Sequence, residues 1–112
     1  MKNNNHENYL ERKPLRNEQF LWSFEENAVT LEIQNKGIMN KIAQKLFKKP
    51  KISYIHLDEM GSFIWPLLDG NKTIIEIGIS VKEKFGDAAE PLYDRLAKYF
   101  QILDSYGFIL WN

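Results

Sequence analysis

The spacing of hydrophobic residues divides the first half of the chain into distinct elements. Between residues 20 and 34 they occupy alternate positions, first at Phe20, Trp22 and Phe24 and then from Val29 to Ile33. This alternation predicts two strands, and the polar residues 25–27 between them predict a hairpin connection three to five residues long. The run Ile52–Leu57 is rich in β-branched and aromatic residues and predicts a third strand.

Between the second and third strands the hydrophobic residues recur every four positions instead. Ile38, Ile42 and Leu46 lie on one face of a helix, and lysines and amides occupy the opposite face. We expect an amphipathic helix over residues 38–48, which ends before Pro50.

Two further helices are expected directly after the third strand. The first begins at Asp58, an N-cap residue, and stops at Asp69-Gly70. Because Pro66 lies inside its pattern, this helix is short or kinked. The second opens with a capping box made by Thr73 and Glu76.

A longer helix closes the chain. It follows Phe85-Gly86, with Asp87 as the expected N-cap and Pro91 in its first turn. Its hydrophobic positions continue to Gly107, which is expected to end the helix in the left-handed conformation. Residues 108–111 are apolar and are expected to dock as a short extended segment.

The order of these elements predicts an α+β fold. We expect a small antiparallel sheet of about three strands and a three-helix, winged-helix-like bundle, with the amphipathic helix over 38–48 as an addition. Residues 1–18 are polar, and we expect them to form a flexible leader. Residues 19–112 are expected to form a single domain. The chain has no apolar stretch typical of a secretory signal or a membrane span, and we expect a cytoplasmic protein.

The amino-acid composition excludes several classes of functional site. The chain has no cysteine, which excludes disulfides, thiol nucleophiles and zinc sites built on thiolates. It has two histidines, His6 and His56, too few for a histidine-rich metal site. The acidic pair Asp58-Glu59 is explained by the favourable interaction of acids with a helix N-terminus. We therefore expect a binding protein without catalytic residues, metal or cofactor.

The zero net charge hides an uneven distribution. Residues 36–51 carry six lysines and no acid, a local charge of +6, whereas residues 1–35 carry −2 and residues 52–112 carry −4. A winged-helix nucleic-acid-binding or regulatory protein would use this lysine segment on phosphates. The last helix argues against nucleic acid, because it offers Asp94 and Asp104 and few basic groups. The same segment could instead anchor the protein to a membrane surface or to a partner.

One combination of motifs resembles a known family. The stretch from His56 to Trp65 is followed by Leu67-Leu68-Asp69-Gly70, by Lys72-Thr73-Ile74-Ile75-Glu76-Ile77, by Phe85-Gly86 and by Tyr106-Gly107-Phe108-Ile109. This pattern resembles the PqqD family, named for pyrroloquinoline quinone biosynthesis protein D, over about residues 52–110. The Asp-Gly turn, the capping box and the glycines also have plain structural roles in ending and capping helices.

The resemblance implies a peptide-binding function. PqqD-like proteins are peptide chaperones, also called recognition elements for ribosomally made and post-translationally modified peptides. A precursor peptide adds as a strand to the edge of the third strand, lies against the last helix and is presented to a modifying enzyme, often a radical SAM protein. The matching residues here are those of the third strand, Ile52, Ser53, Tyr54, Ile55, His56 and Leu57, and four of the last helix, Leu92, Arg95, Leu96 and Tyr99.

Arg95 has two possible roles at such a site. Its guanidinium could bind an acidic residue of the peptide in bidentate fashion. Alternatively, it is a solvated helix charge that pairs with its neighbours Asp94 or Glu90.

Overall fold

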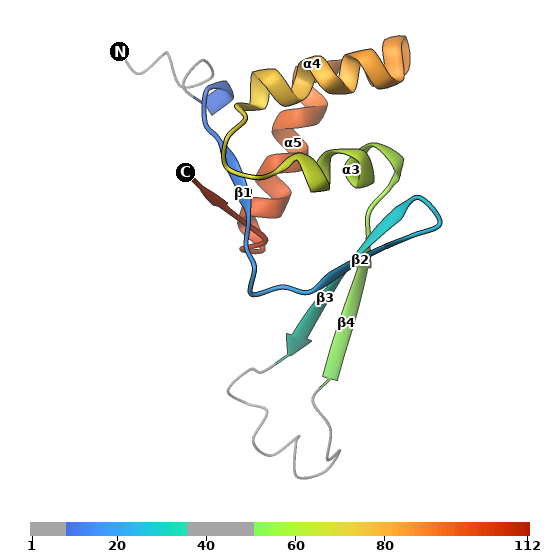
Figure 1. Cartoon of the computed structure of the whole chain (residues 1–112), viewed down its shortest axis with the longest axis vertical. Helices are drawn as coiled ribbons and strands as arrows, with labels where there is room; N and C mark the ends of the chain where they lie inside the picture. The colour runs from blue at the N-terminus through green and yellow to red at the C-terminus, as the bar shows by residue number, and fades with distance from the viewer. Residues whose placement is uncertain (1–8, 36–50) are drawn as a thin grey trace.

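The described part of the chain combines a three-stranded sheet with the helices α3, α4 and α5, which confirms the predicted α+β class (Figure 1). The computed structural model describes residues 9–35 and 51–112, so the helix expected over 38–48 lies outside the described residues. The sheet has the antiparallel order β2-β3-β4 and the helices follow it. The elements are β1 (Pro14–Arg16), β2 (Trp22–Glu25), β3 (Ala28–Asn35), β4 (Lys51–His56), α3 (Glu59–Ile64), the 3-10 helix η2 (Trp65–Leu67), α4 (Ile74–Phe85), the 3-10 helix η3 (Gly86–Ala89), α5 (Leu92–Ser105) and β5 (Ile109–Trp111).

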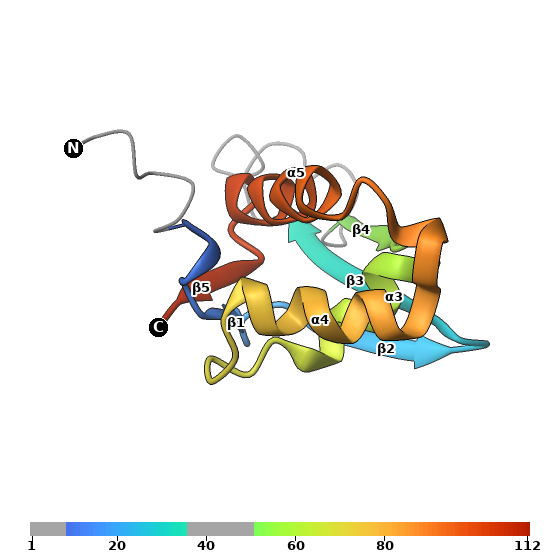
Figure 2. The ribbon, with the colours of Figure 1, turned by 90° about the horizontal axis from the view of Figure 1, so that it is seen from above.

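The sheet has one face toward the helices and one toward solvent. Val29 and Leu31 of β3 are fully buried, and Ile55 of β4, opposite Leu31, packs against the same core. On the outer face Thr30 lies opposite His56, with 2.9 Å between Thr30 Oγ1 and His56 Nδ1. Viewed from above, α5 lies on the β4 side of the molecule and α4 on the β2 side (Figure 2).

The first hairpin is tighter than the sequence suggests. Glu25 pairs directly with Ala28, so the loop holds only Glu26 and Asn27, not three to five residues. Both loop residues have positive φ, 54° and 63°. Two-residue turns of this kind match the twist of the flanking strands, and asparagine tolerates the left-handed region better than most residues. Phe20 precedes the strand, and its ring packs edge-on against Phe108 with 4.9 Å between ring centroids.

The predicted helix signals of α3 and α4 are confirmed. Asp58 caps α3 by accepting a hydrogen bond from the Gly61 N–H at 2.8 Å. The helix is short and passes into the 3-10 turn that contains Pro66. In α4 the Thr73 side chain accepts from the Glu76 N–H, and the Glu76 carboxylate accepts from the Thr73 N–H, which completes the capping box.

The expected N-cap of the last helix, Asp87, is wrong. Residues 86–89 form the 3-10 turn η3, and α5 begins only after Pro91. A residue before proline disfavours the helical conformation, and Glu90 is extended, so the helix cannot run through it. The Glu90 carboxylate accepts from the Leu92 N–H at 3.1 Å in place of a conventional cap.

Part of the expected flexible leader is ordered. Strand β1 pairs with β5 at the other end of the chain, and the prediction for residues 1–18 is therefore wrong for Pro14–Arg16. On its other side β1 meets the Asp69-Gly70 turn, where the Arg16 N–H donates to Leu68 O and the Gly70 N–H donates to Pro14 O, each at 3.0 Å. These long-range backbone hydrogen bonds order a segment whose own sequence is mostly polar.

A buried serine joins the sheet to the helices. Ser62 of α3 is 1% exposed, and its Oγ accepts from the Val29 N–H at 2.8 Å and donates to Leu57 O at 3.1 Å. The Leu57 N–H in turn donates to Val29 O at 2.9 Å. One hydroxyl thus connects β3, the end of β4 and the first turn of α3.

We expect Ser62→Ala to lower the free energy of unfolding by about 1–3 kcal/mol, because it leaves a buried N–H and a buried carbonyl without their partner. Urea titration at neutral pH measures this change. Ser105→Ala is the matched control, since the Ser105 hydroxyl bonds to Ile102 O at an exposed position and its loss should cost less than about 0.5 kcal/mol. Equal losses in the two variants would contradict the role given to Ser62.

Candidate functional site

The outer edge of β4 is unpaired within the described part of the chain. Because the Leu57 N–H donates to Val29 O, the alternate residues Ile55 and Ser53 also direct their backbone groups toward β3. The N–H and C=O groups of Ile52, Tyr54 and His56 consequently point away from the sheet. Such a row of backbone donors and acceptors is a template for another strand.

The side chains of β4 divide between the two faces in the same alternation. Ile52 and Tyr54 are 39% and 56% exposed, and His56 is exposed as well. Ile55 and Leu57 are half-buried and pack against the core, and Ser53 is half-buried on their face of the sheet. Ile52, Tyr54 and His56 therefore supply both the outward backbone groups and the exposed side chains of this edge.

One flank of α5 faces the end of β4. The Tyr99 hydroxyl donates to Gly61 O at 3.0 Å, and a Cβ added at Gly61 would lie 3.0 Å from Tyr99 Cε1. Tyr99 is thereby fixed against the first turn of α3. This turn is capped by Asp58 and follows β4 in the chain. Since residues four and three positions apart share a helix face, Arg95 and Ile102 lie on the same flank of α5 as Tyr99.

Leu92 and Leu96 do not belong to this flank. They are 8% and 0% exposed, and they pack beside Gly78 of α4, where an added Cβ would meet Leu96 Cδ1 at 3.0 Å and Leu92 Cδ2 at 3.6 Å. The two leucines, which the sequence suggests as groove residues, are instead core residues between α4 and α5. Ile102, which the sequence reading omits, is 50% exposed on the Tyr99 flank. The spacing could have identified it, because Ile102 lies seven residues, or two helical turns, after Arg95 and is an apolar residue on an otherwise polar face.

Arg95 makes neither of its expected neighbour pairs. Its Nη1 donates to Ala88 O at 2.7 Å, which ties α5 to η3. Glu90 pairs with Lys82 instead, at 2.6 Å, and hydrogen bonding to Lys82 holds the pKa of Glu90 below its usual value. Within the described residues Arg95 has no ion pair, so its charge is not neutralised by an acidic side chain there.

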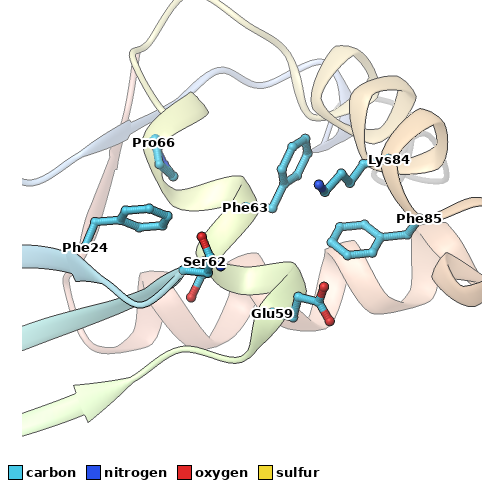
Figure 3. Close-up of a pocket in the computed structure, with 8 residues that line it drawn as sticks. Phe24, Glu59, Ser62, Phe63, Pro66, Lys84 and Phe85 are labelled. Atoms are coloured by element: carbon cyan, nitrogen blue, oxygen red, sulfur yellow. The ribbon is translucent and has the colours of Figure 1, made fainter.

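A separate hollow of about 320 Å³ lies on the helix face of the sheet, between the β2–β3 hairpin, α3 and the end of α4, and Figure 3 shows the side chains that line it. Phe24, Phe63, Phe85 and Pro66 supply its apolar wall, and Phe63 and Phe85 meet edge to face with 5.6 Å between ring centroids. The Ser62 hydroxyl at its floor is already engaged by backbone groups. Asn27, Glu59 and Lys84 also line the hollow, so its wall is partly apolar and partly polar.

No cluster of three or more His, Asp or Glu side chains in residues 9–35 and 51–112 is placed to hold a metal ion. In the same residues no helix is both long enough and apolar enough to cross a bilayer. The described residues also contain an open strand edge at β4, a flank of α5 held against the turn after that strand, and a partly apolar hollow near β2.

Residues 46–109, more than half of the chain, match the family described as coenzyme PQQ synthesis protein D, PqqD. The chain belongs to the PqqD family. The match includes β4, α3, α4, α5 and the beginning of β5, and it leaves β1, β2 and β3 outside. No curated protein and no solved structure matches the chain significantly.

PqqD membership bears on function at a coarse level. PqqD proteins are accessory proteins of PQQ biosynthesis, and the family is associated with binding a precursor peptide and partner enzymes. The competing interpretation, nucleic-acid binding by the lysine segment, concerns residues 36–51, of which only the backbone of Lys51 in β4 is described. That interpretation stays a prediction.

The contact of Tyr99 with α3 should be visible as a pH effect on stability. Burial, assisted by the charge of Asp58, raises the pKa of Tyr99 above its usual value of 10.0. Above pH 10 the unfolded chain therefore ionises this tyrosine while the folded chain does not, and stability falls as the pH rises. We expect wild type to lose about 1 kcal/mol more than Tyr99→Phe between pH 9 and pH 11 in urea titrations.

Tyr93→Phe is the control for this experiment, because Tyr93 is 46% exposed on the same helix. It should follow the wild-type pH dependence. If Tyr93→Phe and Tyr99→Phe behaved alike, the Tyr99 hydroxyl would not be held against Gly61 as described.

Proposed function

We propose that this PqqD-family protein is a peptide-recognition protein that binds the leader of a ribosomally made precursor at the β4 edge. The bound leader would be presented to a modifying enzyme, such as a radical SAM protein, in the cytoplasm where precursors are synthesised. The observation that carries this proposal is the open edge of β4, with the Tyr99 flank of α5 held against the turn of α3 that follows this strand. Family membership supports it independently.

Strand addition explains how such an edge gives affinity. An extended peptide alongside β4 would exchange backbone hydrogen bonds with Ile52, Tyr54 and His56, which already direct both N–H and C=O outward. These bonds do not depend on the sequence of the peptide. The edge therefore supplies general affinity for an extended segment and fixes its position.

Specificity would come from the neighbouring helix flank. Ile102 and the Tyr99 ring offer apolar contact to alternate peptide side chains, since successive side chains of a strand point to opposite faces. Arg95, whose guanidinium keeps donors beyond its bond to Ala88 O, would bind an acidic peptide residue. The preferred leader thus combines an apolar residue with an acidic one.

The backbone role of β4 is tested by a proline that blocks its outer edge. The Tyr54 N–H points away from β3, so Tyr54→Pro removes one outward donor and leaves the β3–β4 hydrogen bonds in place. We expect this variant to bind leader peptides at least about tenfold more weakly, as measured by isothermal titration calorimetry. The peptides tested are synthetic versions of those encoded by small open reading frames next to the gene for this protein.

Tyr54→Ala is the matched control, because it removes the same ring but keeps the N–H. It should bind more tightly than Tyr54→Pro, and circular dichroism should show both variants folded. Equal affinity of Tyr54→Pro and wild type would refute strand addition at β4. Salt-sensitive binding of random duplex DNA, with no peptide binding, would favour the lysine-segment interpretation instead.

A further inference from the structure

The side chain of His56 ends a row of residues that crosses the outer face of the sheet. Ser23 of β2 lies opposite Thr30 of β3, and Thr30 lies opposite His56 of β4. His56 is exposed, and its backbone N–H and C=O point toward the open edge of β4. A strand added at this edge would continue the row with one residue of its own beside His56.

The contact with Thr30 orients the imidazole ring of His56. Thr30 Oγ1 and His56 Nδ1 are 2.9 Å apart, so Nδ1 points toward β3. The second nitrogen, Nε2, lies across the ring from Nδ1 and consequently points toward the open side of β4. Glu32, two residues after Thr30 on the same face, forms no hydrogen bond or ion pair with His56 in the described part of the chain. Nε2 is therefore available to a bound strand.

A carboxylate is the group that best complements this nitrogen. When the Thr30 hydroxyl donates to Nδ1, the neutral ring carries its proton on Nε2, and in the protonated ring both nitrogens donate. Nε2–H is a donor in both forms, and hydrogen bonds to an ionised acceptor are roughly twice as strong as those between neutral groups. We propose that the leader bound at β4 carries an aspartate or glutamate beside His56, which accepts a hydrogen bond from Nε2. This inference rests on the function proposed above.

The geometry of strand addition brings such an acid within reach of the ring. Because the N–H and C=O of His56 both point outward, an antiparallel leader forms a hydrogen-bonded pair there, with about 5.5 Å between the Cα atoms. The two side chains of the pair share the outer face, with their Cβ atoms about 4.5–5.5 Å apart. An aspartate or glutamate side chain spans the remaining distance to Nε2.

This acid is distinct from the one assigned to Arg95. His56 contacts the outer face of the added strand, whereas the Tyr99 flank of α5 lies on the helix side of the sheet. Successive side chains of a strand point to opposite faces, so the two acids are separated by an odd number of positions in the leader. The leader is thus recognised through both of its faces.

A double-mutant cycle between protein and peptide tests the pair. The probe is the peptide encoded next to the gene that binds wild type most tightly, with each of its Asp or Glu residues replaced in turn by Asn or Gln. In calorimetric titrations at neutral pH, one replacement should weaken binding to wild type about two- to fivefold and leave binding to His56→Phe unchanged. His6→Gln, which changes the only other histidine of the chain, is the matched control and should respond as wild type does.

The ring nitrogens give a direct spectroscopic readout. In the His6→Gln variant every histidine ring signal belongs to His56. The ¹⁵N resonance of Nε2 should move when the acidic peptide binds and should move less with the amide-substituted peptide. Thr30→Val removes the hydroxyl that orients the ring and should abolish this difference, whereas Thr30→Ser, which keeps a hydroxyl, should preserve it.

The outcomes separate this inference from the proposed function. A peptide that binds wild type, but whose acids show no coupling to His56 and do not move the Nε2 resonance, would overturn the acid contact and leave strand addition at β4 intact. Equal behaviour of Thr30→Val and Thr30→Ser would overturn the orienting role of Thr30. Failure of every such peptide to bind wild type would overturn both the acid contact and the proposed function.

Discussion

The structure depends on one buried hydroxyl that joins its sheet to its helices. Ser62 Oγ holds Val29 N–H and Leu57 O together at the start of α3, so the end of β4 and the first turn of that helix have a fixed relation. Tyr99 then sets α5 against the same turn through Gly61 O. The angle between the β4 edge and the flank of α5 follows from these two contacts, and so does the geometry proposed for peptide binding.

A second constraint acts at the far end of the molecule. Strand β1 is held between β5 and the Asp69-Gly70 turn, where Gly70 has a φ of 83° and a Cβ would lie 3.3 Å from Leu15 Cδ1. The Asp-Gly motif shared with the PqqD family therefore serves packing here and makes no contact with the proposed peptide edge. The proposed peptide-binding surface instead uses the open backbone edge of β4.

Local signals in the sequence predicted local structure well. The Asp58 cap, the Thr73–Glu76 capping box and the third strand follow from neighbouring residues alone, and the structure confirms them. The pairing of β1 with β5 could not be predicted, because it joins residues about a hundred positions apart with no pattern of their own. Nor does periodicity say which flank of α5 meets α4, so Leu96, which is predicted to line the peptide groove, is a core residue instead.

The central claim is that Ile52, Tyr54 and His56 present their amides to an incoming strand, and amide hydrogen exchange tests it most directly. In the free protein these three amides should exchange quickly, while those of Ile55 and Leu57, bonded to β3, stay protected. A bound leader peptide should slow the exchange of Tyr54 and its two outward neighbours and leave Ile55 unchanged. Binding that leaves the Tyr54 amide as exposed as before would contradict the account.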